Sequence, residues 1–195
     1  MESIQSILEA VSKAAVSARK LSKNQKQIIL TDLASALISN SEKIIQENKK
    51  DLDKMEDSNP KKDRLLLNDA RIKDLSNSLH DILKLEDPTG KVLSDNTMEN
   101  GLRIQKITVP IGVVGVIYEA RPNVTIDVAA LCLYAGNAVV LRGGSDAECT
   151  NLVLVEIIHE ILQKNNTDIN MIQLLPVDRK FVKELLEAVK YVDII

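Results

Sequence analysis

Apolar residues recur at the spacing of α-helices along residues 1–86. The runs are Ile4, Ile7, Leu8, Val11 and Ala15; Ile29, Leu33, Ala36 and Leu37; Ile45, Leu52 and Met55; and Ile72, Leu75, Leu79, Ile82 and Leu83. Asn68 and Asp69 precede the last run, and either one can cap a helix there. Each apolar stripe is narrow and its polar side carries both signs of charge, so the stripes predict core-facing helices rather than a membrane anchor.

The pattern changes between Asp87 and Val109, where short alternating runs are separated by turn residues. The turn residues are Asp87, Pro88 and Gly90, then Asn100 and Gly101, and the apolar positions include Leu102, Ile104, Ile107 and Val109. This alternation predicts a β-hairpin or a pair of extended strands. Projecting ribbons commonly find a partner edge. We therefore expect a homo-oligomer contact through residues 87–109 when the protein is full length.

After Pro110 the pattern alternates between strand and helix. The predicted elements are a strand over 113–118, a helix over 124–134, a strand over 138–141, a helix over 150–162, a strand over 172–175, a helix over 181–189 capped by Asp178, and a strand over 191–195. The apolar strands and the length of the connections between them are typical of right-handed parallel crossovers.

These patterns predict an α/β fold. Helices over 1–86 form a layer, the hairpin occupies 87–109, and a doubly wound parallel sheet with helices on both faces occupies 110–195. Because the chain stops on an apolar strand with no turn residue, we expect it to be truncated relative to its fold.

Composition narrows the classes of function. Of 195 residues, 45% are hydrophobic and 27% charged, which is ordinary for a soluble globular protein, while aromatic residues make up 2%. The formal net charge is −3, and no basic cluster or aromatic platform suits a nucleic acid, so none is expected as a partner. No stretch approaches the ~18 consecutive apolar residues of a membrane span. No membrane association is expected, and the expected location is the cytoplasm.

Residues that bind metals are scarce. Cys132 and Cys149 are the only cysteines, and His80 and His159 are the only histidines. The cysteines are too few and too far apart for a disulfide framework or a zinc site. Both histidines stand in polar surroundings on predicted helices, so we expect them at the surface. No metal site is predicted.

Two turns follow neighbouring apolar strands, at residues 119–123 and 142–145. Because the carboxyl ends of parallel strands meet at one edge, we expect these turns to open side by side onto a shared cleft. Pro122 favours the start of the next helix. The glycines after Arg142 let backbone N–H groups, and the partly positive start of the next helix, approach an anion. On spacing alone, the alternative is two plain strand-to-helix turns.

The stretch "PIGVVGVIYEARPNVTIDVAALCLYAGNAVVLRGGSDA", residues 110–147, resembles the gamma-glutamyl phosphate reductases of the aldehyde dehydrogenase superfamily. Further segments of the same family follow its order along the chain: "DRLLLNDARI" from Asp63, "DPTGKVL" from Asp87, "NGLRI" from Asn100 and "YVDII" at the end. The resemblance therefore covers nearly the whole chain.

This resemblance implies a cofactor domain, a catalytic domain and an oligomerisation hairpin. It also implies reduction of L-glutamate 5-phosphate by NADPH to L-glutamate 5-semialdehyde and phosphate, in proline biosynthesis. A cysteine thiolate attacks the acyl phosphate to give a thioester, and hydride transfer then releases the aldehyde. In the family this cysteine lies in a second α/β domain, expected downstream, so no catalytic residue is assigned within this chain. Cys132 on an apolar helix, and Cys149 beside Asp146 and Glu148, are poor replacements.

The resemblance also assigns cofactor-binding residues. Arg142 stands where relatives carry a basic residue that meets the adenosine ribose or its phosphate, and it is followed by Gly143, Gly144 and Ser145. Relatives that prefer NAD often carry a carboxylate where Ser145 stands, so these residues favour a 2′-phosphate and hence NADPH. Glu119, at the other turn, is assigned to the cofactor side as well.

Arg121 and Asn123 are the candidates for the substrate or oxyanion position. The sequence does not decide between them, and the guanidinium of Arg121 suits the substrate phosphate or carboxylate equally well. A second function class stays open beside the enzyme: a non-catalytic fragment that binds a nucleotide, or a partner through the hairpin and the sheet edge.

Overall fold

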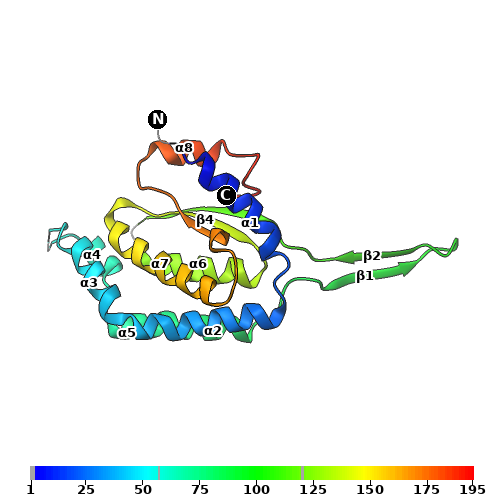
Figure 1. Cartoon of the computed structure of the whole chain (residues 1–195), viewed down its shortest axis with the longest axis horizontal. Coiled ribbons are helices and arrows are strands. Elements are labelled where there is room, and N and C mark those ends of the chain that lie inside the picture. Colours follow the sequence, from blue (N-terminus) through cyan, green and yellow to red (C-terminus); the bar gives the residue numbers. More distant parts are fainter. Residues whose placement is uncertain (1–2, 57, 120) are drawn as a thin grey trace.

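The computed structural model of the chain describes residues 3–56, 58–119 and 121–195, and it arranges helices in layers about a parallel sheet (Figure 1). The N-terminal helices are α1 (Gln5–Ala18), α2 (Lys23–Ser39), α3 (Ser41–Leu52), α4 (Lys61–Leu65) and α5 (Asp69–Lys84). The strands β1 (Val92–Thr97) and β2 (Arg103–Ile107) follow. The remaining elements are β3 (Val113–Ile117), α6 (Pro122–Tyr134), β4 (Ala138–Arg142), η1 (Ser145–Ala147), α7 (Glu148–Lys164), η2 (Ile169–Met171), β5 (Ile172–Leu174) and α8 (Lys180–Leu186). The predicted α/β fold is confirmed.

Side-chain caps fix where two of the N-terminal helices begin. Ser22 precedes α2; its Oγ accepts a hydrogen bond from the Gln25 N–H at 3.2 Å, and Gln25 Oε1 accepts one from the Ser22 N–H at 2.9 Å. Asn68 precedes α5, and its Oδ1 accepts a hydrogen bond from the Arg71 N–H at 2.9 Å. Of the two predicted caps, Asn68 is the one that the helix uses.

The parallel sheet has the spatial order β3-β4-β5. Ile117 lies opposite Arg142 in the register of β3 and β4, so these strands end together at one edge. On the free side of β3, Val114 forms an isolated parallel bridge with Ile194. The chain thus adds its last segment beside the first strand of the sheet, which is the arrangement of a doubly wound sheet.

The last predicted strand, over 191–195, is shorter than expected. The backbone N–H groups of Tyr191 and Val192 both donate to the Ala188 carbonyl, at 2.9 and 3.0 Å, so these residues belong to a turn after α8. Within 191–195, backbone hydrogen bonds to the sheet come from Asp193 and Ile194: the Asp193 N–H donates to the Val113 carbonyl at 2.9 Å, and the Ile194 carbonyl accepts from the Gly115 N–H at 2.8 Å. The predicted strand is therefore reduced to a bridge.

Helices cover both faces of the sheet. α6 and α7 lie on one face with α2 and α5 outside them, while α1 and α8 lie on the other face (Figure 1). Alternation along β4 serves both cores, because Leu141 packs with α6 and α7 and Val140 packs with α1 and α8. The single helical layer predicted over 1–86 is divided, because Leu8 and Val11 of α1 fill the face that α6 and α7 leave open.

β1 and β2 pair antiparallel and project from the rest of the molecule (Figure 1). The hairpin predicted within 87–109 is confirmed, and every residue of both strands is exposed. Its exposed large apolar side chains are Val92, Leu93, Met98, Leu102, Ile104, Ile107 and Val109.

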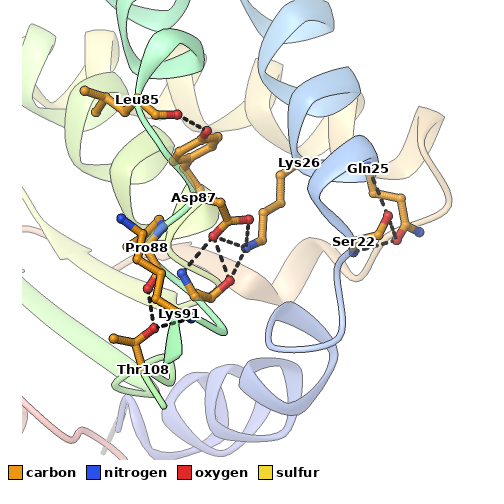
Figure 2. A network of polar contacts seen from close by, with 10 residues as sticks. Ser22, Gln25, Lys26, Leu85, Asp87, Pro88, Lys91 and Thr108 are labelled. Atoms are coloured by element: carbon orange, nitrogen blue, oxygen red, sulfur yellow. Dashed lines mark hydrogen bonds and ion pairs between the residues drawn. The ribbon is translucent and has the colours of Figure 1, made fainter. Parts of the chain in front are cut away.

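A network of polar contacts holds the base of the hairpin (Figure 2). Lys26 of α2 is only 2% exposed, and its Nζ lies 3.1 Å from Asp87 Oδ2 and 3.1 Å from Thr89 Oγ1. The Tyr134 hydroxyl of α6 donates to the Leu85 carbonyl at 2.6 Å. The chain entering the hairpin is thus fixed to both α2 and α6.

Candidate functional site

The turns after β3 and β4 lie next to each other at the carboxyl edge of the sheet. The Tyr118 N–H donates to the Arg142 carbonyl at 3.1 Å, where both chains leave the sheet. The predicted adjacency of the two turns is confirmed.

The two turns line separate hollows. Arg121 and Asn123 line a pocket of about 400 Å³, whereas Gly143 lines a pocket of about 200 Å³, and the two pockets have no lining residue in common. Tyr118 fills the space over Gly143: a Cβ built on Gly143 would lie 3.2 Å from the Tyr118 hydroxyl oxygen. Among the described residues the two turns thus lie side by side but line different pockets, and the single shared cleft stays a prediction.

The first turn leads directly into α6. Arg121 has an extended backbone, with φ −139° and ψ 89°, and Pro122 is the first residue of the helix, as predicted. Glu119 is exposed and its carbonyl accepts a hydrogen bond from the Arg121 N–H at 3.0 Å. Arg121 and Asn123 are both exposed at the mouth of the larger pocket. The residue between Glu119 and Arg121 lies outside the described residues.

The larger pocket also receives residues from α4, α5 and the segment that joins them. These residues are Asp63, Arg64, Leu66, Leu67, Arg71, Asp74, Leu75 and Ser78, and Asp127 of α6 completes the lining. This segment belongs to the stretch "DRLLLNDARI", which carries the family resemblance but which the sequence does not predict to be part of the site. Its several arginine and aspartate residues are the feature from which a role in binding can be predicted.

Arg142 points away from solvent. It is 9% exposed, and its Nη2 donates to the Val177 carbonyl at 2.5 Å. Its Nε is buried without a hydrogen-bond partner. Val177 lines the smaller pocket together with Gly143, so the guanidinium lies beside that pocket, on the side of α8.

A buried polar cluster adjoins Gly143. The Thr125 hydroxyl lies 2.6 Å from the Tyr118 hydroxyl and donates to Asn151 Oδ1 at 2.8 Å. Asn151 is 1% exposed, and its Nδ2 has no hydrogen-bond partner and lies 2.3 Å from where a Cβ on Gly143 would stand. Glycine at this position therefore leaves room for the Asn151 amide beside the smaller pocket. Gly144 and the exposed Ser145 follow.

A carboxylate of the chain itself occupies the N-terminus of α7. Asp51 of α3 is fully buried, and its carboxylate accepts hydrogen bonds from the backbone N–H groups of Cys149 (3.2 Å) and Thr150 (2.8 Å). Burial alone would raise the pKa of Asp51, but hydrogen bonds from Thr150 and Lys54 outweigh it and hold that pKa below its ordinary value. The predicted use of this helix N-terminus by a ligand anion is wrong for these N–H groups, because Asp51 occupies them.

Both thiols are held in the neutral form. Burial raises the pKa of Cys132 to about 11. The pKa of Cys149 is also raised, first by burial and then by the carboxylate of Asp51, although Lys54, with its Nζ 3.6 Å from Cys149 Sγ, acts in the opposite direction. Neither group has the lowered pKa of a reactive cysteine.

His80 is exposed, as predicted, but His159 is not a free surface residue. His159 is half-buried, and its Nε2 lies 2.6 Å from the Ile172 carbonyl because α7 packs against β5. Among the described residues, no group of three His, Cys, Asp or Glu side chains is arranged to hold a metal ion. No helix in the described ranges is long and apolar enough to cross a membrane.

Comparison with known proteins places this geometry in a family. A model of the aldehyde dehydrogenase family matches residues 1–195. The gamma-glutamyl phosphate reductase of Chlorobium phaeobacteroides (strain BS1) is 45% identical over 194 residues, which are 100% of this chain and 46% of that protein. The crystal structure of the Thermotoga maritima gamma-glutamyl phosphate reductase superposes with a TM-score of 0.94 at 32% identity, over 98% of this chain and 47% of that one.

A second crystal structure agrees. The gamma-glutamyl phosphate reductase of Saccharomyces cerevisiae superposes with a TM-score of 0.88 at 28% identity, over 100% of this chain and 51% of that one. The chain thus spans about half the length of the relatives that it matches. These findings confirm the resemblance to the gamma-glutamyl phosphate reductases. The chain belongs to the aldehyde dehydrogenase family.

Proposed function

We propose that this chain is the nucleotide-binding part of an NADPH-dependent enzyme that converts L-glutamate 5-phosphate to L-glutamate 5-semialdehyde and phosphate in proline biosynthesis. The observation that carries the proposal is the adjacency of the turns after β3 and β4, shown by the hydrogen bond from the Tyr118 N–H to the Arg142 carbonyl. The named relatives support the same reaction. A biosynthetic enzyme of this kind would work in the cytoplasm.

The smaller pocket suits part of a nicotinamide nucleotide. Asn151 Nδ2 and Arg142 Nε are buried donors without partners, and Gly143 keeps the backbone open beside them. Glu148 also lines the pocket, and its carboxylate can accept a hydrogen bond from a ribose hydroxyl other than the 2′-hydroxyl, which NADPH carries as a phosphate ester. When bound, NADPH supplies the hydride of the reduction.

The preference for NADPH over NADH rests on the second turn. Ser145 stands where NAD-preferring relatives often carry a carboxylate. Arg142 adds a cation to the same turn, and Gly144 adds a residue without a side chain. A carboxylate there would repel a 2′-phosphate, and these residues attract one. Glu119, exposed at the other turn, is proposed to lie on the cofactor side.

Arg121 and Asn123 are proposed to face the reacting end of the substrate. Both line the larger pocket at the carboxyl edge of the sheet, where developing charge on the acyl oxygen or the phosphate would be met by the guanidinium or the amide. The thiolate nucleophile is proposed to come from outside these 195 residues, because Cys132 and Cys149 both have raised pKa values. The chain alone should therefore not turn over.

A split-enzyme assay tests this proposal. The chain is fused to the part of the Chlorobium phaeobacteroides relative that lies beyond the matched region, and NADP⁺ reduction is followed with L-glutamate 5-semialdehyde and phosphate. We expect phosphate-dependent reduction by the fusion, faster with NADP⁺ than with NAD⁺, and none by the chain alone. An inactive but folded fusion would reject the proposed reaction, and a preference for NAD⁺ would reject the assigned cofactor.

The hairpin is proposed to contact a second copy of the same chain. Its strands are exposed throughout, and Leu93, Ile104 and Ile107 are each at least half exposed, although they are large and apolar. Exposed strands that carry large apolar side chains are typical of interaction surfaces.

A further inference from the structure

The larger pocket carries unpaired charges of both signs. Arg64 of α4 and Arg121 before α6 supply guanidinium groups, and Asp74 of α5 and Asp127 of α6 supply carboxylates. Within the described ranges none of these four side chains forms an ion pair. The volume of about 400 Å³ lies in the range of small-molecule sites, about 300–1,000 Å³. This pocket is therefore large enough for an amino acid and offers partners for both of its charged ends.

Neighbouring contacts brace the corner of the chain that carries Arg64. Arg71 Nη2 donates to Asp63 Oδ1 at 2.8 Å, and its Nη1 donates to the Leu66 carbonyl at 2.9 Å, which braces the corner between α4 and α5. Arg71 is thus already neutralised, whereas the adjacent Arg64 is not. This bracing fixes the backbone at the corner from which the exposed Arg64 side chain extends.

The carboxylate of Asp127 is held by contacts from two sides. Its Oδ1 lies 2.9 Å from the Ser78 hydroxyl of α5, and its Oδ2 lies 3.5 Å from Asn123 Nδ2, at the limit of a hydrogen bond. Asp127 Oδ2 therefore keeps acceptor capacity for a cation in the pocket. Because Asn123 is a candidate substrate contact, this carboxylate lies directly beside the proposed reaction centre.

We propose that this pocket binds the amino-acid end of the substrate, with Arg64 on the α-carboxylate and Asp127 on the α-ammonium group. The inference rests on the proposed function and extends it to substrate specificity. L-Glutamate 5-phosphate carries two anionic groups and one cationic group. Arg121, at the strand edge, then remains for the acyl phosphate, so each charged group of the substrate has an opposite charge in the pocket.

Ligand titrations of the purified chain, followed by NMR, test the proposal without catalysis. L-Glutamate is compared with glutarate, which lacks only the α-ammonium group, and with 4-aminobutanoate, which lacks only the α-carboxylate. We expect L-glutamate to shift the backbone signals of the pocket and to bind about tenfold more tightly than either analogue. Equal binding of glutarate and L-glutamate, or no shift in the pocket, would overturn the proposal.

Two variants test which pocket residue binds which charged group of the ligand. Asp127→Asn should weaken L-glutamate binding about tenfold and leave glutarate binding nearly unchanged, whereas Arg64→Gln should weaken L-glutamate and glutarate and spare 4-aminobutanoate. Arg179→Gln, an exposed arginine outside the pocket, is the matched control and should change nothing. A variant that weakens all three ligands equally would contradict its assignment.

The split-enzyme assay separates this inference from the proposed reaction. An active fusion combined with a chain that does not distinguish L-glutamate from glutarate would overturn the amino-acid pocket alone. An inactive fusion combined with selective L-glutamate binding would reject the reaction and support the pocket.

Discussion

At the scale of single residues, Asp51 takes the position at the start of α7 that a bound anion would occupy. Its carboxylate accepts hydrogen bonds from the N–H groups of Cys149 and Thr150 and from the Thr150 hydroxyl, the last at 2.8 Å. It also joins α3 to α7, which are further linked by a hydrogen bond from Asn48 Nδ2 to the Thr150 hydroxyl at 3.1 Å and by the exposed ion pair of Lys43 and Glu156 at 2.9 Å. A cofactor bound at the neighbouring turn must therefore depend on side chains and on the backbone of residues 143–145 more than on this helix end.

Replacing Asp51 by asparagine should destabilise the fold by about 1–3 kcal/mol at about pH 7, because the amide keeps only one acceptor oxygen for several donors. The folded-state pKa of Asp51 is lowered, so its stabilisation is present above the pKa of the unfolded carboxyl, about 3.9, and is lost as the pH falls through the lower folded value. Urea unfolding at a series of pH values measures both effects. The difference between wild type and variant should shrink below about pH 4.

Asp53→Asn is the matched control, because Asp53 stands two positions further along the chain and is exposed. It should leave the free energy of unfolding within about 0.5 kcal/mol of wild type. A stability difference for Asp51→Asn that stayed constant with pH would show that the carboxylate charge is not what stabilises α7.

At the scale of elements, local pattern predicted most of the fold and only part of the site. The alternation after Pro110 predicted β3, α6, β4 and α7 because strand and helix periods are properties of neighbouring residues. Contacts between segments that are distant in the sequence produce no periodic pattern in either segment. Nothing near Thr150 indicates that Asp51 will cap α7, and nothing near Asn123 indicates that Arg64 will line the same pocket.

The ion pair between Lys26 of α2 and Asp87 at the base of the hairpin is one of these contacts between distant segments. Lys26→Met should destabilise the fold by about 3–5 kcal/mol, because Lys26 is buried and its loss leaves Asp87 with an uncompensated charge. Thermal or urea unfolding measures the loss. The Lys26→Met/Asp87→Asn double variant should recover part of it, since the stranded charge is then removed.

Lys84→Met serves as the control for this pair. Lys84 lies 2.7 Å from Asp81, but both side chains are at least 70% exposed, so little stability should be lost. If the double variant were as unstable as Lys26→Met alone, the cost would come from lost side-chain contacts of Lys26 and not from the charge of Asp87.

At the scale of the whole molecule, the sheet and the hairpin have different roles. The sheet is buried on both faces and gathers the candidate site at its carboxyl edge, whereas the hairpin has no apolar partner within the described residues. The network around Lys26 and Asp87 nevertheless fixes the base of the hairpin to the layered helices (Figure 2). A ribbon anchored at one end, with exposed apolar side chains among its polar ones, is suited to pairing with another copy.

Ile104→Asn should therefore weaken self-association while leaving the protomer fold intact. Ile104 is 50% exposed on β2, so its removal costs little within one chain but removes apolar surface from the proposed contact. Sedimentation velocity over a range of concentrations should give an association constant lowered about tenfold or more. Lys106→Asn, two positions further along and on the same side of the strand, places the same amide there without removing apolar surface and should associate like wild type. A wild-type chain that stayed monomeric at every concentration, or two variants with equal association constants, would show that the apolar surface of Ile104 is not part of a contact between copies.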